Sequence, residues 1–195
     1  MTEDVWMWLL LATGFTGGLT FVFLFRRLYH WLVTPLSLAV YFSPKGGCQE
    51  AMVREIQRAR REILVQAYSF TADPLTYGLV DAKKRGVNVE ILLDRSNEQE
   101  QYSDLRILLD QGLAPLIDAK HAIAHNKVMI IDQRVVVTGS YNFTNQAENE
   151  NAENVVIIKG NRSLIQSYRA NFLEHKSHCQ AAQLKTPAAP QRKAA

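Results

Sequence analysis

Strand-like and helix-like segments alternate along most of this chain, and the alternation limits the folds open to it. Runs rich in β-branched and large apolar residues cover 63–70, 87–94, 113–118, 127–132, 134–140 and 153–159. Segments with apolar residues at helical spacing cover 48–63, 73–86, 98–112 and 163–175. Strands and helices that alternate in one chain predict an α/β domain, with helices packed on a mixed β-sheet.

A long uncharged run precedes this pattern. Residues 5–25 carry no charged side chain, and a helix of that length measures about 31 Å, which matches the hydrocarbon core of a bilayer. Trp6, Trp8 and Trp31 lie near its ends, where indole rings favour the membrane interface. We therefore expect one transmembrane helix. An anchor is favoured over a cleaved signal peptide, because the chain opens with acidic residues and no small-residue cleavage site follows.

Charge near the run predicts its orientation. Arg26 and Arg27 follow it and no basic residue precedes it, so the positive-inside rule favours the cytoplasm over the periplasm for the rest of the chain. Gly14 and Gly18 have the spacing that lets two membrane helices approach closely. The sequence thus predicts a single-pass membrane protein, with its anchor and an interfacial linker in residues 1–40.

The remaining chain divides into a domain and a tail. Residues 41–176 carry the alternating pattern, and a chain that is 47% hydrophobic can bury one core there. Residues 177–195 hold few large apolar side chains, so we expect them to be disordered. The formal net charge of +3 permits a phosphate-bearing partner without identifying one. Cys48 and Cys179 have no disulfide or metal-ligand spacing, so we expect both to be free.

Polar residues interrupt the apolar strands between His125 and Thr144. Residues two apart on a strand project from the same face, so His125 and Lys127 point together, as do Ser140 and Asn142. An imidazole can act as a nucleophile or as an acid or base, and ammonium and amide groups donate to anionic oxygens. If the two segments meet at one end of the sheet, these four side chains would suit a phosphoryl group.

Six residues in this stretch have the spacing HxKxxxxDxxxxxxGSxN: His125, Lys127, Asp132, Gly139, Ser140 and Asn142. The pattern resembles the signature of the phospholipase D superfamily, and the resemblance covers residues 41–176. It points above all to the short single-motif bacterial endonucleases, and it is similar to the mitochondrial single-motif branch in its expected N-terminal anchor. The resemblance implies a phospholipase D-like layered fold and a hydrolase that cleaves phosphodiester bonds without a metal or other cofactor.

The resemblance also implies a role for each residue. His125 would attack phosphorus and form a covalent phosphohistidine. Lys127 and Asn142 would hold the non-bridging oxygens, and Ser140 would support the phosphate pocket. Glu153 has the position of the family acid that fixes the motif histidine through its other ring nitrogen.

Two further expectations come from the same resemblance. Asp132 matches the motif aspartate, which completes the catalytic set although its role in the family is more structural than chemical. The family mechanism needs a second motif histidine to protonate the leaving oxygen and then activate water. Because this chain carries one motif, the resemblance implies a homodimer in which two copies share one active site.

Other interpretations stay open. Ser140 and Asn142 could be ordinary turn residues after a strand, and Glu153 could be a solvated loop acid. His121 lies four residues before His125, but no further ligands with coordinating geometry are evident, so no metal site is predicted.

The substrate is open as well. Similarity to the short endonucleases favours a nuclease that acts on DNA or RNA. The expected bilayer anchor favours a phospholipase D that acts on membrane phospholipid instead. Membrane attachment through residues 5–25 would place the enzyme close to that lipid.

Overall fold

The computed structural model describes residues 14, 16–29, 36–98 and 104–183. The chain divides into two compact units, Met1–Leu36 and Ser37–Ala195. The candidate site lies within the second unit. The predicted organisation into an anchor over 1–40, a domain over 41–176 and a disordered tail over 177–195 stays a prediction.

The transmembrane helix predicted for residues 5–25 is wrong by this structure. Among the described residues, no helix is both long enough and apolar enough to cross a membrane. Residues 5–13 and 15 lie outside the described residues. The single-pass localisation and its cytoplasmic orientation, which rested on that helix, are corrected with it.

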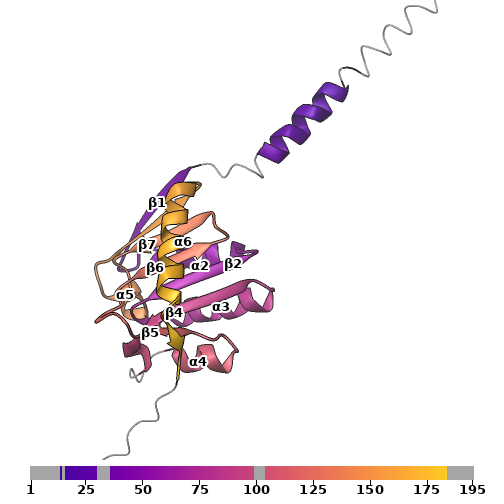
Figure 1. The fold of residues 1–195 in the computed structure, drawn as a ribbon. Helices are drawn as coiled ribbons and strands as arrows, with labels where there is room; N and C mark the ends of the chain where they lie inside the picture. The colour runs from indigo at the N-terminus through magenta and orange to yellow at the C-terminus, as the bar shows by residue number, and fades with distance from the viewer. Residues whose placement is uncertain (1–13, 15, 30–35, 99–103, 184–195) are drawn as a thin grey trace, which may run out of the picture. The chain divides into compact units, whose positions relative to one another are not determined.

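An eight-stranded mixed sheet forms the centre of the second unit (Figure 1), with strand order β1-β9-β7-β6-β2-β4-β5-β10. Its strands are β1 (Ser37–Phe42), β2 (Glu62–Ala67), β4 (Asn88–Asp94), β5 (Leu116–Asp118), β6 (Lys127–Ile131), β7 (Val135–Gly139), β9 (Asn154–Lys159) and β10 (Gln180–Ala181). The pairs β2–β4 and β4–β5 are parallel, and the other neighbours pair antiparallel. The mixed α/β fold predicted from the alternating pattern is confirmed.

Helices cover both faces of this sheet, with α6 on one face and α2 and α3 on the other (Figure 1). The helices are α2 (Cys48–Arg58), α3 (Asp73–Lys84), α4 (Leu105–Asp110), α5 (Asn145–Asn149) and α6 (Arg162–Lys176), with a 3-10 turn η1 (Arg95–Glu98). Strand β6 serves both resulting cores. Met129 and Ile131 pack into the core beneath α2 and α3, whereas Val128 and Ile130 pack beneath α6.

Three elements differ from the sequence expectations. Within the predicted helix 98–112, helix α4 covers Leu105–Asp110, and Glu98 belongs instead to the 3-10 turn Arg95–Glu98. Residues 99–103 lie outside the described residues. Strand β1 begins at Ser37, inside the predicted linker, and pairs with β9 as an edge strand. Strand β10 lies in the predicted tail, where Gln180 and Ala181 pair with β5.

A tight hairpin joins β6 to β7. The Arg134 N–H donates to the Ile131 carbonyl at 2.9 Å, and Asp132 and Gln133 both have φ near +54°. Positive φ at both central positions is the geometry of a type I′ turn, which matches the twist of paired strands. The turn sets the register, in which Val128 faces Thr138.

A minor two-stranded sheet lies at the other end of this hairpin. Strand β3 (Phe70–Thr71) runs parallel to β8 (Phe143–Thr144). The Phe70 and Phe143 rings pack edge to face, with 5.9 Å between their centroids. This contact ties the segment after β2 to the segment after β7.

Gly139, at the end of β7, is required by close backbone packing. Its φ is +156°, and a Cβ there would lie 2.1 Å from the Asn154 carbonyl oxygen. We therefore expect Gly139→Ala to lower the free energy of unfolding by about 1–3 kcal/mol or more, since β7 and β9 must separate locally. Chemical denaturation followed by circular dichroism measures this loss.

Gly78→Ala is the matched control. Gly78 lies inside α3, and a Cβ there would meet only the Ile56 side chain, at an ordinary 3.4 Å. Alanine favours a helix interior, so the control should be neutral or slightly stabilising. Equal unfolding free energies for the two variants would contradict the packing argument.

Candidate active site

The segment that carries His125 is held in extended form at the end of β6. The Tyr68 N–H, just after β2, donates to the Asn126 carbonyl at 3.0 Å and continues the pairing of the two strands. The His125 side chain is exposed, and its ring packs against the Tyr68 ring with 4.5 Å between centroids. An imidazole is thus presented to solvent on a fixed backbone.

Lys127 is buried beside that imidazole, with a relative exposure of 7%. Its ammonium donates to the His125 carbonyl oxygen at 2.8 Å and lies 5.1 Å from the centroid of the Tyr68 ring. Burial lowers the pKa of Lys127, while the negative charge of Glu153 opposes that change. An ammonium group has three N–H donors, and the His125 carbonyl is its one hydrogen-bond acceptor among the described residues. The remaining donors can therefore bind an anionic oxygen.

Ser140 and Asn142 follow β7 at the same end of the sheet, because Lys127 comes directly before the Val128–Thr138 pair. The Ser140 hydroxyl donates to the Asn154 side-chain oxygen and accepts from the Asn154 N–H, each at 3.1 Å.

The Asn142 side chain is only partly satisfied. Its Oδ1 is buried and has no hydrogen-bond partner among the described residues. An unsatisfied buried polar atom costs about 1–3 kcal/mol, so this position favours a ligand that donates a hydrogen bond.

Glu153 lies near this group without touching His125. Among the described residues, its carboxylate accepts a hydrogen bond from Asn151 Nδ2 at 3.2 Å, and none comes from His125. Its backbone is fixed by two hydrogen bonds with Ser43, at 3.0 and 3.2 Å. The structure therefore places Glu153 where its charge acts on Lys127. Its role as the acid that orients His125 stays a prediction.

Asp132 lies at the opposite end of β6, roughly 20 Å along the strand from His125. Its carboxylate accepts backbone N–H hydrogen bonds from Arg60, Arg61 and Glu62, at 2.7 to 3.2 Å. These contacts fix the start of β2 to the β6–β7 turn. The motif aspartate is therefore not brought into the group around His125.

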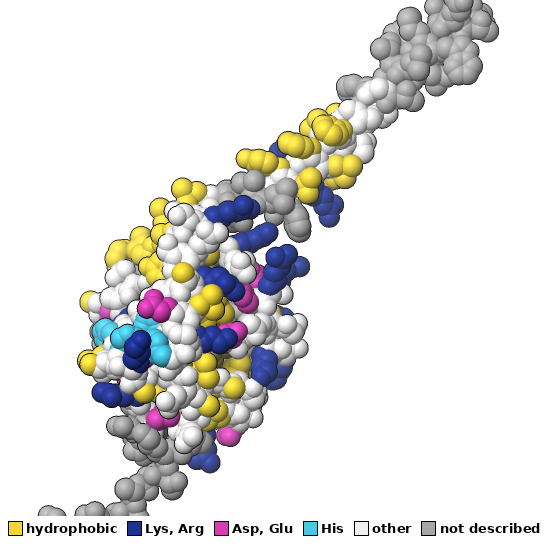
Figure 2. All heavy atoms as spheres, in the orientation of Figure 1, with side chains coloured by type: hydrophobic (Ala, Val, Ile, Leu, Met, Phe, Trp, Pro, Cys, Tyr) yellow, Lys and Arg dark blue, Asp and Glu magenta, His cyan; other side chains and the backbone are white. Residues whose placement is uncertain are grey.

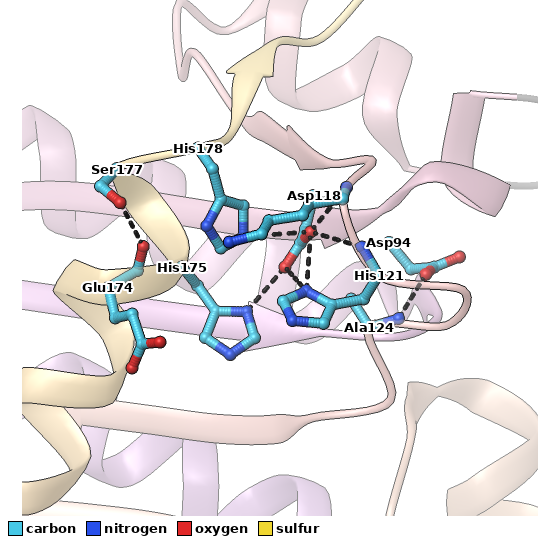
Figure 3. Close-up of polar contacts among 9 residues, drawn as sticks. Asp94, Asp118, His121, Ala124, Glu174, His175, Ser177 and His178 are labelled. Carbon is cyan, nitrogen blue, oxygen red and sulfur yellow. Dashed lines mark hydrogen bonds and ion pairs between the residues drawn. The ribbon is translucent and has the colours of Figure 1, made fainter.

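A second polar cluster, which the sequence interpretation missed, lies on the α6 side of the sheet (Figure 3). It consists of Asp118, His121, His175 and His178, and one ligand atom from each lies within 4.8 Å of the others. Histidine side chains also gather in one patch at the surface in Figure 2. The sequence signal that could have predicted this cluster is two pairs of residues at i, i+3 spacing, Asp118 with His121 and His175 with His178. Those pairs are 54 residues apart in sequence, from 121 to 175, and only the fold joins them.

Comparison with known proteins finds several similar chains. A family model described as "Cardiolipin synthase, PLD-like domain" matches residues 52–176. A protein named "Phospholipase D" from Rickettsia felis is 41% identical over 154 residues, which cover 77% of this chain and 76% of the relative. The crystal structure of Nuc, a phospholipase D family member from Salmonella typhimurium, is 34% identical, with a TM-score of 0.72 over 75% of this chain and 98% of that one. A "Mitochondrial cardiolipin hydrolase" from Chlamydomonas reinhardtii is 32% identical over 71% of this chain and 57% of its own length.

The position of Asp132 generates a prediction about stability. Asp132→Ala removes the acceptor of three backbone N–H groups, so we expect the free energy of unfolding to fall by about 1–3 kcal/mol. Asp132→Asn keeps one side-chain oxygen and should lose less. Urea denaturation of both variants and the wild-type chain measures the ranking of their unfolding free energies. Equal stability of all three would show that the carboxylate does not hold the start of β2.

Proposed function

Because the chain belongs to the phospholipase D superfamily, we propose that it hydrolyses phosphodiester bonds through a covalent intermediate on His125. The observation that carries the proposal is the pairing of an exposed imidazole, His125, with the buried ammonium of Lys127. The ring is open to a phosphorus atom from solvent, and Lys127 has spare donors for the phosphoryl oxygens. Asn142 supplies another donor, and Ser140 supports the pocket through its hydrogen bonds with Asn154.

The proposed reaction has two steps. In the first, a ring nitrogen of His125 attacks phosphorus, a P–N bond forms, and the bond between phosphorus and the leaving oxygen breaks while a second imidazole protonates that oxygen. In the second, the same imidazole takes a proton from water, whose oxygen attacks phosphorus and releases His125. The charge of Lys127 stabilises the negative charge that develops on the phosphoryl oxygens, because Lys127 itself is buried and its charge is less screened by water.

The second imidazole is proposed to come from a second copy of the chain. Three of the four histidines in the described part of the chain, His121, His175 and His178, contact Asp118. These three lie on the α6 side of the sheet, whereas Lys127 and Met129 alternate onto the other side. A symmetric dimer that apposes two His125 side chains would complete the site.

Nucleic acid is the proposed substrate. Lys120 and Arg95 place cationic side chains by the loop 119–126 that leads to His125, and an Arg95 guanidinium N–H donates to the Ala122 carbonyl at 3.3 Å. Cationic groups at the loop that carries the proposed nucleophile suit a repeating phosphate backbone. The resemblance of the motif to that of the short single-motif bacterial endonucleases supports the same choice.

A membrane phospholipid is the second candidate substrate. Ile123, two residues before His125, is 59% exposed and would meet an apolar lipid surface at the mouth of the site. Relatives named "Phospholipase D" and "Mitochondrial cardiolipin hydrolase" support this alternative. Parallel assays on single- and double-stranded nucleic acid and on phosphatidylcholine and cardiolipin vesicles separate the two candidates.

His125→Ala should reduce turnover of the preferred substrate about a thousandfold or more, because it removes the nucleophile. Wild-type chain quenched in alkali during turnover of a phosphorus-labelled substrate should carry an acid-labile label on His125. The mutant should carry none.

Lys84→Ala, an exposed change on α3, serves as the control and should keep normal rates. Both variants should melt like the wild type. Near-normal turnover by folded His125→Ala on every substrate would refute the assignment.

The proposed dimer predicts a non-linear mixing curve. When wild-type and His125→Ala chains exchange subunits, each mixed dimer holds one motif histidine. Activity should then fall roughly with the square of the wild-type fraction. Sedimentation establishes the oligomeric state at the assay concentration. Activity proportional to the wild-type fraction after verified exchange, or an active monomer, would refute the shared site.

A further inference from the structure

The cluster around Asp118 joins three parts of the fold (Figure 3). Asp118 ends β5, His121 lies in the loop 119–126, His175 lies in the last turn of α6, and His178 follows that helix. The Asp118 side chain is 2% exposed, and those of His175 and His178 are 14% and 17% exposed. A buried carboxylate surrounded by three imidazoles is therefore a specific feature of this end of the sheet.

The distances in the cluster approach those of a tetrahedral metal site. The Asp118 oxygens lie 3.1 Å from His121 Nδ1, 2.6 Å from His175 Nδ1 and 3.3 Å from His178 Nε2. Tetrahedral zinc with bonds of about 2.0–2.1 Å places its ligand atoms roughly 3.3 Å apart. All four ligand atoms lie within 4.8 Å of one another, so small side-chain rotations would close them around one ion.

One ring nitrogen in the cluster lacks a satisfactory partner. His178 Nε2 is buried and makes no hydrogen bond among the described residues, although an Asp118 oxygen lies 3.3 Å away. His178 Nε2 and the Asp118 oxygen are thus close enough for an ion pair, but their geometry does not form a hydrogen bond. One carboxylate has two oxygens for three imidazoles, whereas a cation would accept a lone pair from each ring and from the carboxylate.

We propose that Asp118, His121, His175 and His178 bind one Zn²⁺ ion, which fastens the loop 119–126 to the end of α6. Three nitrogens and one oxygen suit zinc, and magnesium prefers six oxygen ligands. Four protein ligands fill a tetrahedral shell, so the ion serves structure and leaves no position for substrate.

The proposed zinc site can influence His125 only through the backbone of the loop 119–126 that joins them. His121 and His125 lie four residues apart in the same loop. Asn126, which lines a small cavity with Asp118 and His175, alternates with Lys127 and so faces away from the phosphate pocket. Zinc would therefore hold the loop that carries His125 without contacting the reacting phosphate.

The test uses the full chain, purified without a histidine tag and loaded with ZnCl₂ before dialysis. We expect about one zinc per chain by mass spectrometry of the metal. Zinc affinity should be more than about a hundredfold weaker in His121→Asn and His178→Ala, since each removes a ligand. MgCl₂ should not load the site.

His125→Ala is the matched control, because it removes a histidine from the same loop outside the cluster and should keep full zinc content. EDTA should lower the melting temperature of the wild type and His125→Ala, and should leave that of His178→Ala unchanged. Should His178→Ala fail to fold, His121→Asn carries the same test, because His121 is 43% exposed. Equal zinc content and affinity in wild type and His121→Asn would overturn the proposal. These readouts are independent of turnover.

Discussion

The burial of β6 on both faces is the constraint on which the rest of the structure depends. Val128 and Ile130 must pack beneath α6 while Met129 and Ile131 pack beneath α2 and α3. A shift by one residue would exchange these faces and disrupt both cores. The same alternation carries Lys127 to one side and Asn126 to the other. The packing of apolar residues therefore decides on which side of the sheet the charged group of the site lies.

Two polar groups of the candidate site, on Lys127 and Asn142, lose solvation on folding that a bound ligand could replace. Lys127 is 7% exposed and its ammonium donates to a neutral carbonyl, and Asn142 Oδ1 is buried without a hydrogen-bond partner among the described residues. Both groups lose solvation when the chain folds, and neither regains all of it from protein atoms. An anionic oxygen would satisfy Lys127, and a donor group of a ligand would satisfy Asn142 Oδ1.

The sequence predicted the fold where the pattern was local. Each strand of the motif region could be recognised from β-branched runs, and His125 and Lys127 from their spacing. It could not predict the cluster at Asp118, because His121 and His175 meet only through the packing of α6 on the sheet. The transmembrane expectation rested on the hydropathy of residues 5–25, which measures composition. Among the described residues, no helix is both long enough and apolar enough to cross a membrane. Strands β1 and β10 were missed because each depends on a distant partner, β9 and β5.

The pairing of β1 with β9 has a practical consequence for how the second unit can be separated from the first. Residues 37–42 cover the open side of β9 along its full length, from Lys159 to Asn154. A chain shortened to begin at Tyr41 would uncover most of the β9 backbone. Its freed amide and carbonyl groups would then be available to strands of other molecules, which is a route to aggregation. A shortened chain should therefore begin before Ser37, even though the proposed catalytic motif begins only at His125.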